Sequence, residues 1–367
     1  MKIFFIDPQS YNALGEYDRL FLAELDNIVE VEPIFYCNEN FEADVDSYQT
    51  VKIFKYQKYK QNIRKVFSYI YSYLTILLHI SSQKPDVVHI QWYRALLIDI
   101  FIFYCIKFLS KKIVYTCHNF RPHNTGKKYD FMRKYLYDLF STIFVHDHST
   151  YESLIELGIH PSKIIQIEYG LTPLSPKHNS IKCNKKVHPI TFLFCGFISE
   201  YKGIENFIKP WKKVFKDSKD FEFKIAGKFI TENYSKYIKE MSIDSKNIII
   251  DDKFQTIEQF KENILGSHVI VLPYKEASQS AVLMTVLTFG RKVIVSDVGG
   301  LGQTFRKAPF IGWMFKTEND LINILRNLKE TPRENFFLDA KENLLLENKF
   351  SWKNTVGITM QVYKNEN

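Results

Sequence analysis

Residues 269–300, which read VIVLPYKEASQSAVLMTVLTFGRKVIVSDVGG, constrain the fold more than any other stretch of this chain. An apolar run ends at Pro273, a short polar loop follows, and a second run, apolar enough for a buried helix, ends at Gly290. Residues 293–295 then form another apolar run. This order predicts strand, helix and strand, with the two strands parallel because the helix crosses over one face of the sheet.

The loop between the first strand and the helix lies at the carboxyl edge of the predicted sheet, where ligands of open α/β sheets bind. A serine that caps the helix leaves backbone N–H groups and the positive end of the helix dipole facing an anion such as a diphosphate. A packed strand–helix–strand unit without a ligand is the alternative interpretation. The candidate anion site consists of Glu276, Ser278, Gln279, Ser280, Ala281 and Val282.

Length and composition fit a protein with two α/β domains. A chain of 367 residues exceeds what one hydrophobic core supports. The formal net charge of +8 favours anionic partners, which include nucleotide sugars, phospholipid head groups and nucleic acid. Five cysteines without CxxC spacing indicate reduced thiols in a cytoplasmic protein. Asp251 and Asp252 are adjacent and no DxD follows a predicted strand, so we expect no metal cofactor.

Three predicted strands of the first half each deliver a histidine at or near the carboxyl edge of a sheet: His89, His118 and His146. A lone histidine is more often structural, whereas three at equivalent edges favour a lined cleft. Trp92 follows the first of these strands. A metal site at residues 146–148 is disfavoured, because successive side chains of a strand point apart. We assign His89, Trp92 and His146 to the lining of such a cleft.

A glycine-containing loop opens the second half of the chain. Gly196 and Gly203 permit close approach of a ligand to the backbone, and Lys202 lies where it can act as a point charge on a phosphate. Gly227 and Phe254 follow two further predicted strands.

Four segments of the region first described match one known pattern: 273–274, 277–282, 289–290 and 293–301. Together they resemble the donor-site segment of retaining GT-B glycosyltransferases of family four. The resemblance implies two Rossmann-like, doubly wound α/β domains that face a central cleft, and a nucleoside diphosphate sugar as substrate. Many members carry two glutamates here, eight positions apart. Ala277 and Thr285 occupy those positions in this chain, and Glu276 lies one residue early.

The resemblance also implies roles for single residues, and it assigns His89, Trp92 and His146 to the acceptor side of the cleft. His118 matches the histidine that meets the donor sugar, and Lys202 matches the cation of the phosphate-binding loop, so both are candidate catalytic residues. Gly196 and Gly203 belong to that loop. An arginine found there in many members is missing, because Phe197 and Ser199 occupy the candidate positions.

Two further regions follow from the same resemblance. The strand ends at Gly227 and Phe254 frame the nucleotide base in relatives. The first polar loop, residues 7–15, approaches the donor phosphates or the acceptor, which makes Gly15 a candidate donor contact. No GxGxxG pattern lies near Gly15, and this counts against a dinucleotide-dependent dehydrogenase.

Composition places the domain boundaries in the middle and near the end of the chain. Residues 173–189 are rich in Pro, Lys, Asn and Ser and are typical of a linker. We expect an acceptor-binding domain at 1–172 and a nucleotide-sugar-binding domain at 190–350. By resemblance, residues 351–367 form a helix that crosses back to the first domain.

Residues 52–80 combine basic and apolar side chains. No acidic residue occurs between Asp46 and Asp86, and apolar residues recur at helical spacing from Val66 to Leu78. The segment fits contact with an anionic membrane surface, or a stripe that faces the sheet while the lysines are solvated. The longest apolar run, 95–109, is too short and too charged to span a bilayer, so we expect no transmembrane helix.

The expected activity is transfer of a hexose-type sugar from a nucleoside diphosphate sugar to a hydroxyl of a glycan or lipid-linked acceptor. Surface polysaccharide biosynthesis, in the cytoplasm or at the inner face of its membrane, is what the resemblance suggests. A sugar-nucleotide-binding subunit without activity is the main alternative. A nucleic-acid-binding protein ranks last, because it leaves the polar strand ends unexplained.

Overall fold

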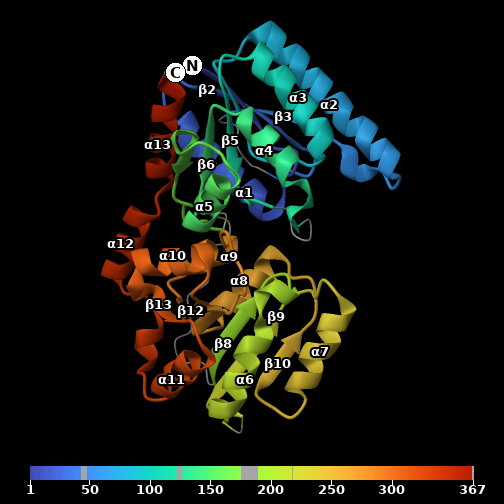
Figure 1. Cartoon of the computed structure of the whole chain (residues 1–367). Coiled ribbons are helices and arrows are strands. Elements are labelled where there is room, and N and C mark those ends of the chain that lie inside the picture. The colour runs from blue at the N-terminus through green and yellow to red at the C-terminus, as the bar shows by residue number, and fades with distance from the viewer. Residues whose placement is uncertain (43–47, 122–125, 175–188, 217, 366–367) are drawn as a thin grey trace. The chain divides into compact units, whose positions relative to one another are not determined.

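The computed structural model describes residues 1–42, 48–121, 126–174, 189–216 and 218–365 (Figure 1). The chain divides into two compact units. Unit 1 combines residues 1–170 with the C-terminal residues from Ser351 onward, and unit 2 comprises Leu171–Phe350. Most of the expected linker, residues 175–188, lies outside the described residues.

The sheet of unit 1 is built from short apolar runs, because a parallel sheet is covered on both faces and its strands are buried throughout. In the described part of unit 1 it has seven strands in the order β3-β2-β1-β4-β5-β6-β7, and every pair is parallel. The strands are β1 (Lys2–Ile6), β2 (Glu32–Asn38), β3 (Gln49–Phe54), β4 (Val87–Ile90), β5 (Ile113–Cys117), β6 (Thr142–Val145) and β7 (Ile164–Gln166).

Helices cover both faces of this sheet, and successive residues of β1 show which helices lie on which side. Phe4 and Ile6 belong to a core that also contains buried residues of α2 to α5. Phe5 points the other way and stacks on Phe21 of α1, with ring centroids 5.4 Å apart. The helices of unit 1 are α1 (Asn12–Asp26), α2 (Asn62–Gln83), α3 (Leu96–Leu109), α4 (Asp130–Asp138), α5 (His148–Glu156) and α13 (Trp352–Lys364).

The C-terminal helix α13 packs against unit 1 through its two ends. Trp352 lies against Gly170, where an added Cβ would come within 2.5 Å of the indole ring. The same ring packs edge-on against the fully buried Tyr17 of α1, with centroids 4.9 Å apart. At the other end, the Tyr363 hydroxyl is hydrogen-bonded to Nδ1 of His89 in β4. Helix α13 therefore completes the hydrophobic core of unit 1, to which α1 and β4 also contribute.

Unit 2 repeats the same architecture with a smaller sheet. Its described residues form six parallel strands in the order β10-β9-β8-β11-β12-β13. The strands are β8 (Ile190–Cys195), β9 (Phe221–Ala226), β10 (Ile248–Asp251), β11 (Val269–Leu272), β12 (Lys292–Ser296) and β13 (Gly312–Phe315). The helices are α6 (Ile204–Phe215), α7 (Glu232–Ser242), α8 (Ile257–Leu265), α9 (Ala281–Leu287), α10 (Gly299–Lys307), α11 (Glu318–Leu328) and α12 (Ala340–Lys349).

Two expectations from the sequence are wrong in detail. Gly15 does not lie in a loop, because α1 already begins at Asn12, and its Cα packs closely against the backbone of Ser10. Helix α2 does not present a single buried stripe. Tyr69 and Tyr73 face the core, but Leu74 and Leu78 are 54% and 71% exposed. Among the described residues, no helix is long and apolar enough to cross a membrane.

Close backbone contact in unit 2 leaves no room for a side chain at Gly227. Gly227 has φ of +156°, and a Cβ built there would lie 1.8 Å from the carbonyl oxygen of Gly196. We expect Gly227→Ala to lower the free energy of unfolding by about 3 kcal/mol, through overpacking and backbone strain. Gly357→Ala is the matched control, since nothing lies within 4 Å of an added Cβ in α13. It should stabilise the chain by about 0.5–1 kcal/mol. Urea unfolding measures both; equal effects would contradict the contact.

Candidate active site

A hydrogen-bonded chain of side chains occupies the carboxyl edge of the unit 1 sheet. His118 follows β5, and its Nε2 is 2.9 Å from Oε1 of Gln91. The amide nitrogen of Gln91 is 2.9 Å from Nε2 of His89, which is also 2.7 Å from the Thr116 hydroxyl. The side-chain carbonyl oxygen of Gln91 can only accept a hydrogen bond, so Nε2 of His118 carries the proton and donates to it. In the neutral ring, Nδ1 of His118 is then the acceptor nitrogen. The orientation of His118 is thus fixed from within the core.

The three predicted histidines differ in position. His118 and His146 lie beyond the ends of their strands, with ring centroids 5.4 Å apart, and Tyr17 packs edge-on against both rings. His89 lies inside β4 and is fully buried, so a substrate cannot reach it. Its assignment to the acceptor side is corrected to support of Gln91 and His118. Trp92 is half-buried, with its ring 6.1 Å from that of His118.

Burial keeps these imidazoles neutral. It lowers the pKa of His89 to about 3 and that of His146 to about 4. The pKa of His118 falls well below its ordinary value, first through burial and then through its neighbours His146 and His89. A neutral imidazole donates one hydrogen bond and accepts another, which suits contact with sugar hydroxyls.

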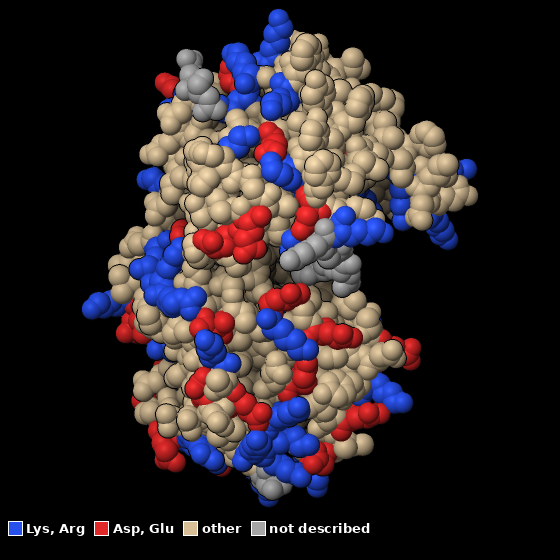
Figure 2. Space-filling view, viewed as in Figure 1, with Lys and Arg blue, Asp and Glu red and all other residues tan. Residues whose placement is uncertain are grey.

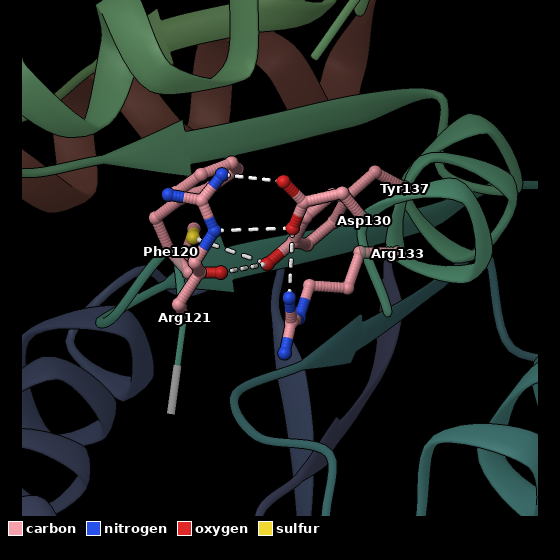
Figure 3. A network of polar contacts seen from close by, with 6 residues as sticks. Phe120, Arg121, Asp130, Arg133 and Tyr137 are labelled. Carbon is pink, nitrogen blue, oxygen red and sulfur yellow. Dashed lines mark hydrogen bonds and ion pairs between the residues drawn. The ribbon is translucent and has the colours of Figure 1, made fainter. Parts of the chain in front are cut away.

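A polar network pins the segment after His118 to helix α4 (Figure 3). Asp130, at the start of α4, binds Arg121 through both carboxylate oxygens, and its Oδ1 also accepts from Arg133 at 2.8 Å. The hydroxyl of Tyr137 donates to the carbonyl of Phe120 at 3.0 Å. The hydrogen bond from Arg121 is the largest cause that lowers the pKa of Asp130. These bonds hold Phe120 and Arg121, on the C-terminal side of His118, against α4.

Lys202 is the central cation of the candidate site in unit 2. It ends a short 3-10 turn after β8 and is only 7% exposed. Its ammonium lies over the ring of Tyr274, 5.1 Å from the centroid, and burial lowers its pKa. In the part of the chain that the structure describes, no carboxylate forms an ion pair with Lys202. A buried ammonium without a carboxylate gains most from a bound anion.

The glycines predicted around Lys202 bring three loops together. Gly196 has φ of +104°, and a Cβ at that position would lie 3.9 Å from the Lys202 ammonium and 3.6 Å from Cγ2 of Val282. Gly203 has φ of +60° and leaves no room for a side chain beside the carbonyl of Pro273. Gly227 packs on Gly196, as described above, so its role is structural. The loop after β8 therefore adjoins the first turn of α9.

The start of α9 has the form that the sequence predicts. Ser280 is its N-cap, and its hydroxyl accepts from the amide of Leu283 at 3.2 Å. The amides of Ala281 and Val282 lie in the first turn, where no intrahelical acceptor exists. Both residues are half-buried. Ser280 thus satisfies one amide of this turn and leaves the lysine-facing end of α9 as the candidate anion site.

The loop that leads into α9 is braced by its neighbours. Lys275 forms an ion pair with Glu205 of α6, 2.5 Å between charged atoms. The carbonyl of Ala277 accepts from the amide of Gly300 at 3.0 Å, and an added Cβ on Gly300 would lie 2.2 Å from the carbonyl oxygen of Ser278. Glu276 is exposed, and Gln279 is half-buried. The start of α10 therefore fixes the path of Ser278 and Gln279.

Both halves of the chain match models of glycosyltransferase families. Residues 30–172 match the model described as Glycosyltransferase Family 4, and residues 189–328 match the model described as Glycosyl transferases group 1. Both units are glycosyltransferase domains of the GT-B class. An uncharacterized glycosyltransferase of Methanocaldococcus jannaschii is 26% identical over 176 residues, 47% of this chain and 44% of that relative. The match therefore spans less than half of the curated relative.

Solved structures share the GT-B fold with this chain. HepE of Anabaena in complex with UDP-glucose superposes with a TM-score of 0.72 at 12% identity, over 99% of this chain and 100% of that one. The sucrose-phosphate synthase of Thermosynechococcus elongatus gives 0.72 at 13% identity, over 99% and 98%. The predicted fold class, two doubly wound α/β domains, is confirmed.

Two side-chain pairings in this GT-B chain escaped the sequence analysis, although Phe254 was itself a candidate donor residue. Phe197 and Phe254 are 45% and 63% exposed, and their rings lie 5.9 Å apart beyond the ends of β8 and β10. Asp7 and Asp18 are buried together in unit 1, where burial raises the pKa of Asp7 to about 6 and that of Asp18 well above its ordinary value. Asp7 had a visible signal, since it ends β1. The other three are joined only by the fold.

The predicted site residues are divided between the two units. Unit 1 contains His118, His89, His146, Trp92 and Gly15, and unit 2 contains the phosphate-loop residues, Phe254 and the residues around Ser280. Asp147 caps α5 by accepting from the amide of Thr150 at 2.9 Å. Among the described residues, no group of three His, Cys, Asp or Glu side chains is placed to hold a metal ion.

The buried histidines of this GT-B chain predict a sign for its pH dependence. His146 binds its proton in the unfolded chain near pH 6.5 but in the fold only near pH 4. Protonation therefore favours unfolding, and stability falls as pH drops through this window. His146→Asn keeps a donor for the carbonyl of Ile167 and removes the titration. It should lose about 1.4 kcal/mol less per pH unit than the unchanged protein between about pH 6 and pH 5.

Urea unfolding at several pH values measures that difference. The buried carboxyls Asp7 and Asp99 have raised pKa values of about 6 and act with the opposite sign. They are common to both proteins, so the difference isolates the histidine. Parallel curves would mean that His146 is charged in the fold.

Proposed function

We propose that this protein transfers a hexose-type sugar, with retention of anomeric configuration, from a nucleoside diphosphate sugar to a hydroxyl of a glycan or lipid-linked acceptor. The observation that carries the proposal is the buried ammonium of Lys202, which lacks a carboxylate partner among the described residues and adjoins Gly196 and the first turn of α9. An anion with two phosphates matches this combination of a cation and backbone amides.

The chemistry follows from where charge develops. When the bond from the anomeric carbon to the diphosphate oxygen breaks, negative charge grows on the leaving phosphate. Lys202 and the amides of Ala281 and Val282 stabilise that charge more than the charge of the bound substrate. The acceptor hydroxyl forms the new bond on the face that the diphosphate leaves, and its proton passes to the leaving phosphate oxygen. No metal is required in this scheme.

The sugar itself needs polar contacts that carry no charge. We assign this role to His118, which burial keeps neutral and Gln91 orients. Ala277 and Thr285 supply no carboxylate where many family members have glutamates, so uncharged groups hold the sugar hydroxyls. Ser278 and Gln279 are the polar residues of that loop.

HepE was solved with UDP-glucose, which makes UDP-hexoses the first donors to test. The exposed rings of Phe197 and Phe254 offer a flat apolar surface to a base at the edge of the unit 2 sheet. Phe197 occupies one of the two candidate positions for the arginine of many relatives, and Ser199 occupies the other. We propose that a ring contact from Phe197 replaces the charge contact of that arginine. Cytoplasmic location and a place in surface polysaccharide synthesis complete the proposal.

Donor binding is tested with Lys202→Ala. The change removes a charge-assisted contact worth about 1.5–3 kcal/mol, so the Kd for UDP should rise about tenfold to a hundredfold. Isothermal titration with UDP, GDP and their sugars measures it, and thermal shift at about 100 times Kd should show about 2.7 kcal/mol of stabilisation in the unchanged protein. Lys236→Ala, an exposed lysine of the same unit, is the control. Equal affinity of all three proteins would place the phosphates elsewhere.

Activity is tested by following the sugar. With a radiolabelled UDP-hexose and a mixture of bacterial glycolipids as acceptors, label should move into the lipid fraction, and NMR of the product should show the anomeric configuration of the donor. His118→Ala should lower kcat more than it changes the Kd for UDP. Donor binding without transfer, and without slow release of free sugar, would instead identify a binding subunit, which the absent glutamates and arginine also fit.

A further inference from the structure

Helix α2 carries a second apolar stripe, on the side away from the sheet. Tyr69, Tyr73, Ile76 and Ile80 are buried and account for its packing in unit 1. The outer stripe recurs at intervals of four, four, three and four residues, which is the spacing of one helix face. Its members, each more than half exposed, are Ile63, Phe67, Tyr71, Leu74 and Leu78.

The neighbouring helices continue this stripe into a broad surface. Helix α3 packs beside α2, and α4 packs beside α3, in one layer on the same face of the sheet (Figure 1). Leu97, Phe101, Tyr104 and Phe108 of α3 are spaced by four, three and four residues. All are between 56% and 83% exposed. Phe131 and Tyr135 extend the row onto α4. We call these residues of α2, α3 and α4 the apolar helix face.

Soluble proteins rarely leave so many large apolar side chains together on one surface. Figure 2 shows the area over α2 and α3 as largely free of charged side chains, with lysine and arginine at its lower end. A surface of this kind requires a partner that accepts aromatic and aliphatic groups over a wide area.

Charge at the margin of the apolar helix face identifies that partner. Lys58, Lys60 and Arg64 are exposed at the end where α2 begins, and Lys107 is exposed near the end of α3. Residues 47–85 contain no acidic residue. The one carboxylate within α2 and α3, Asp99, is fully buried and accepts from the Tyr69 hydroxyl at 2.7 Å. Among the described residues, no ion pair neutralises Lys60 or Arg64.

We propose that the apolar helix face docks on an anionic lipid bilayer, with α2 and α3 lying in the headgroup region. Aromatic and leucine side chains enter the acyl boundary, while the basic margin binds phosphate groups of the lipids. In this arrangement α2 and α3 lie on the membrane surface and do not cross it. A symmetric contact with a second copy is disfavoured, because α2 and α3 offer the basic margin no exposed carboxylate as a partner.

The position of the margin relates this surface to the proposed function. Helix α2 starts just after β3, and α3 starts after β4, so their first turns lie at the carboxyl edge of the parallel sheet. His118 follows β5 at the same edge. An acceptor anchored in the bilayer would present its hydroxyl from the side on which the basic margin meets the lipid. This link rests on the proposed function, whereas the docking itself does not.

Flotation with liposomes tests the docking. The full chain should float with vesicles of phosphatidylcholine containing 30% phosphatidylglycerol, and much less with phosphatidylcholine alone. The double change Phe67→Ser and Phe101→Ser should lower the partition coefficient at least tenfold. The double change Lys60→Ser and Arg64→Ser should lower it about 25-fold at low salt, since each basic side chain contributes about fivefold. Added salt should weaken binding of the unchanged protein.

Two controls separate the possible results. Ile243→Ser removes an apolar side chain of unit 2 that is 87% exposed and should not change flotation. Lys202→Ala should float like the unchanged protein, so failure of donor binding and failure of docking are distinguishable. Sedimentation equilibrium detects a dimer. The proposal is overturned if no vesicle binding occurs, if the phenylalanine changes leave binding intact, or if they dissociate a dimer that binds no lipid.

Discussion

Parallel strand pairing is the constraint on which the rest of this structure depends. Every ladder in both sheets runs in one direction, so every strand of a unit ends at the same edge. Apolar residues dominate the strands because helices cover both faces, and many polar residues collect at the first positions after them. Asp7, His118 and His146 gather in this way in unit 1, as do Gly196 and the loop before α9 in unit 2. Strand direction therefore determines where the candidate site residues lie, and the residue types determine what they can bind.

The candidate residues of the two units use burial in opposite ways. In unit 1, burial removes charge from three imidazoles, and these become fixed donors and acceptors that do not attract counterions. In unit 2, burial leaves Lys202 beside aromatic rings without a carboxylate among the described residues. The same physical cost therefore produces neutral imidazoles in unit 1 and, in unit 2, an ammonium without a carboxylate partner among the described residues.

Local pattern was sufficient for part of this arrangement. Strand, capping serine and helix in residues 269–300 are each determined by neighbours in the sequence, and the structure places them as expected, with Ser280 as the cap. The predicted stripe of α2 failed because the helix is apolar on two sides. Periodicity cannot tell which side is the core, and the choice is made by Asp99, which binds Tyr69 from another helix. The burial of His89 depends on Tyr363, at the far end of the chain, and the pairing of Phe197 with Phe254 depends on strand order.

The return of α13 to unit 1 has a consequence for how the protein is made. Unit 1 is interrupted by unit 2, and its aromatic core lacks Trp352 and Tyr363 until α13 has been synthesised. During translation the N-terminal sheet must therefore wait, with Tyr17 and His89 incompletely covered, while unit 2 emerges from the ribosome and folds as a continuous segment. Loss of residues from α13 would therefore destabilise unit 1, whose sheet is synthesised first, and leave unit 2 intact.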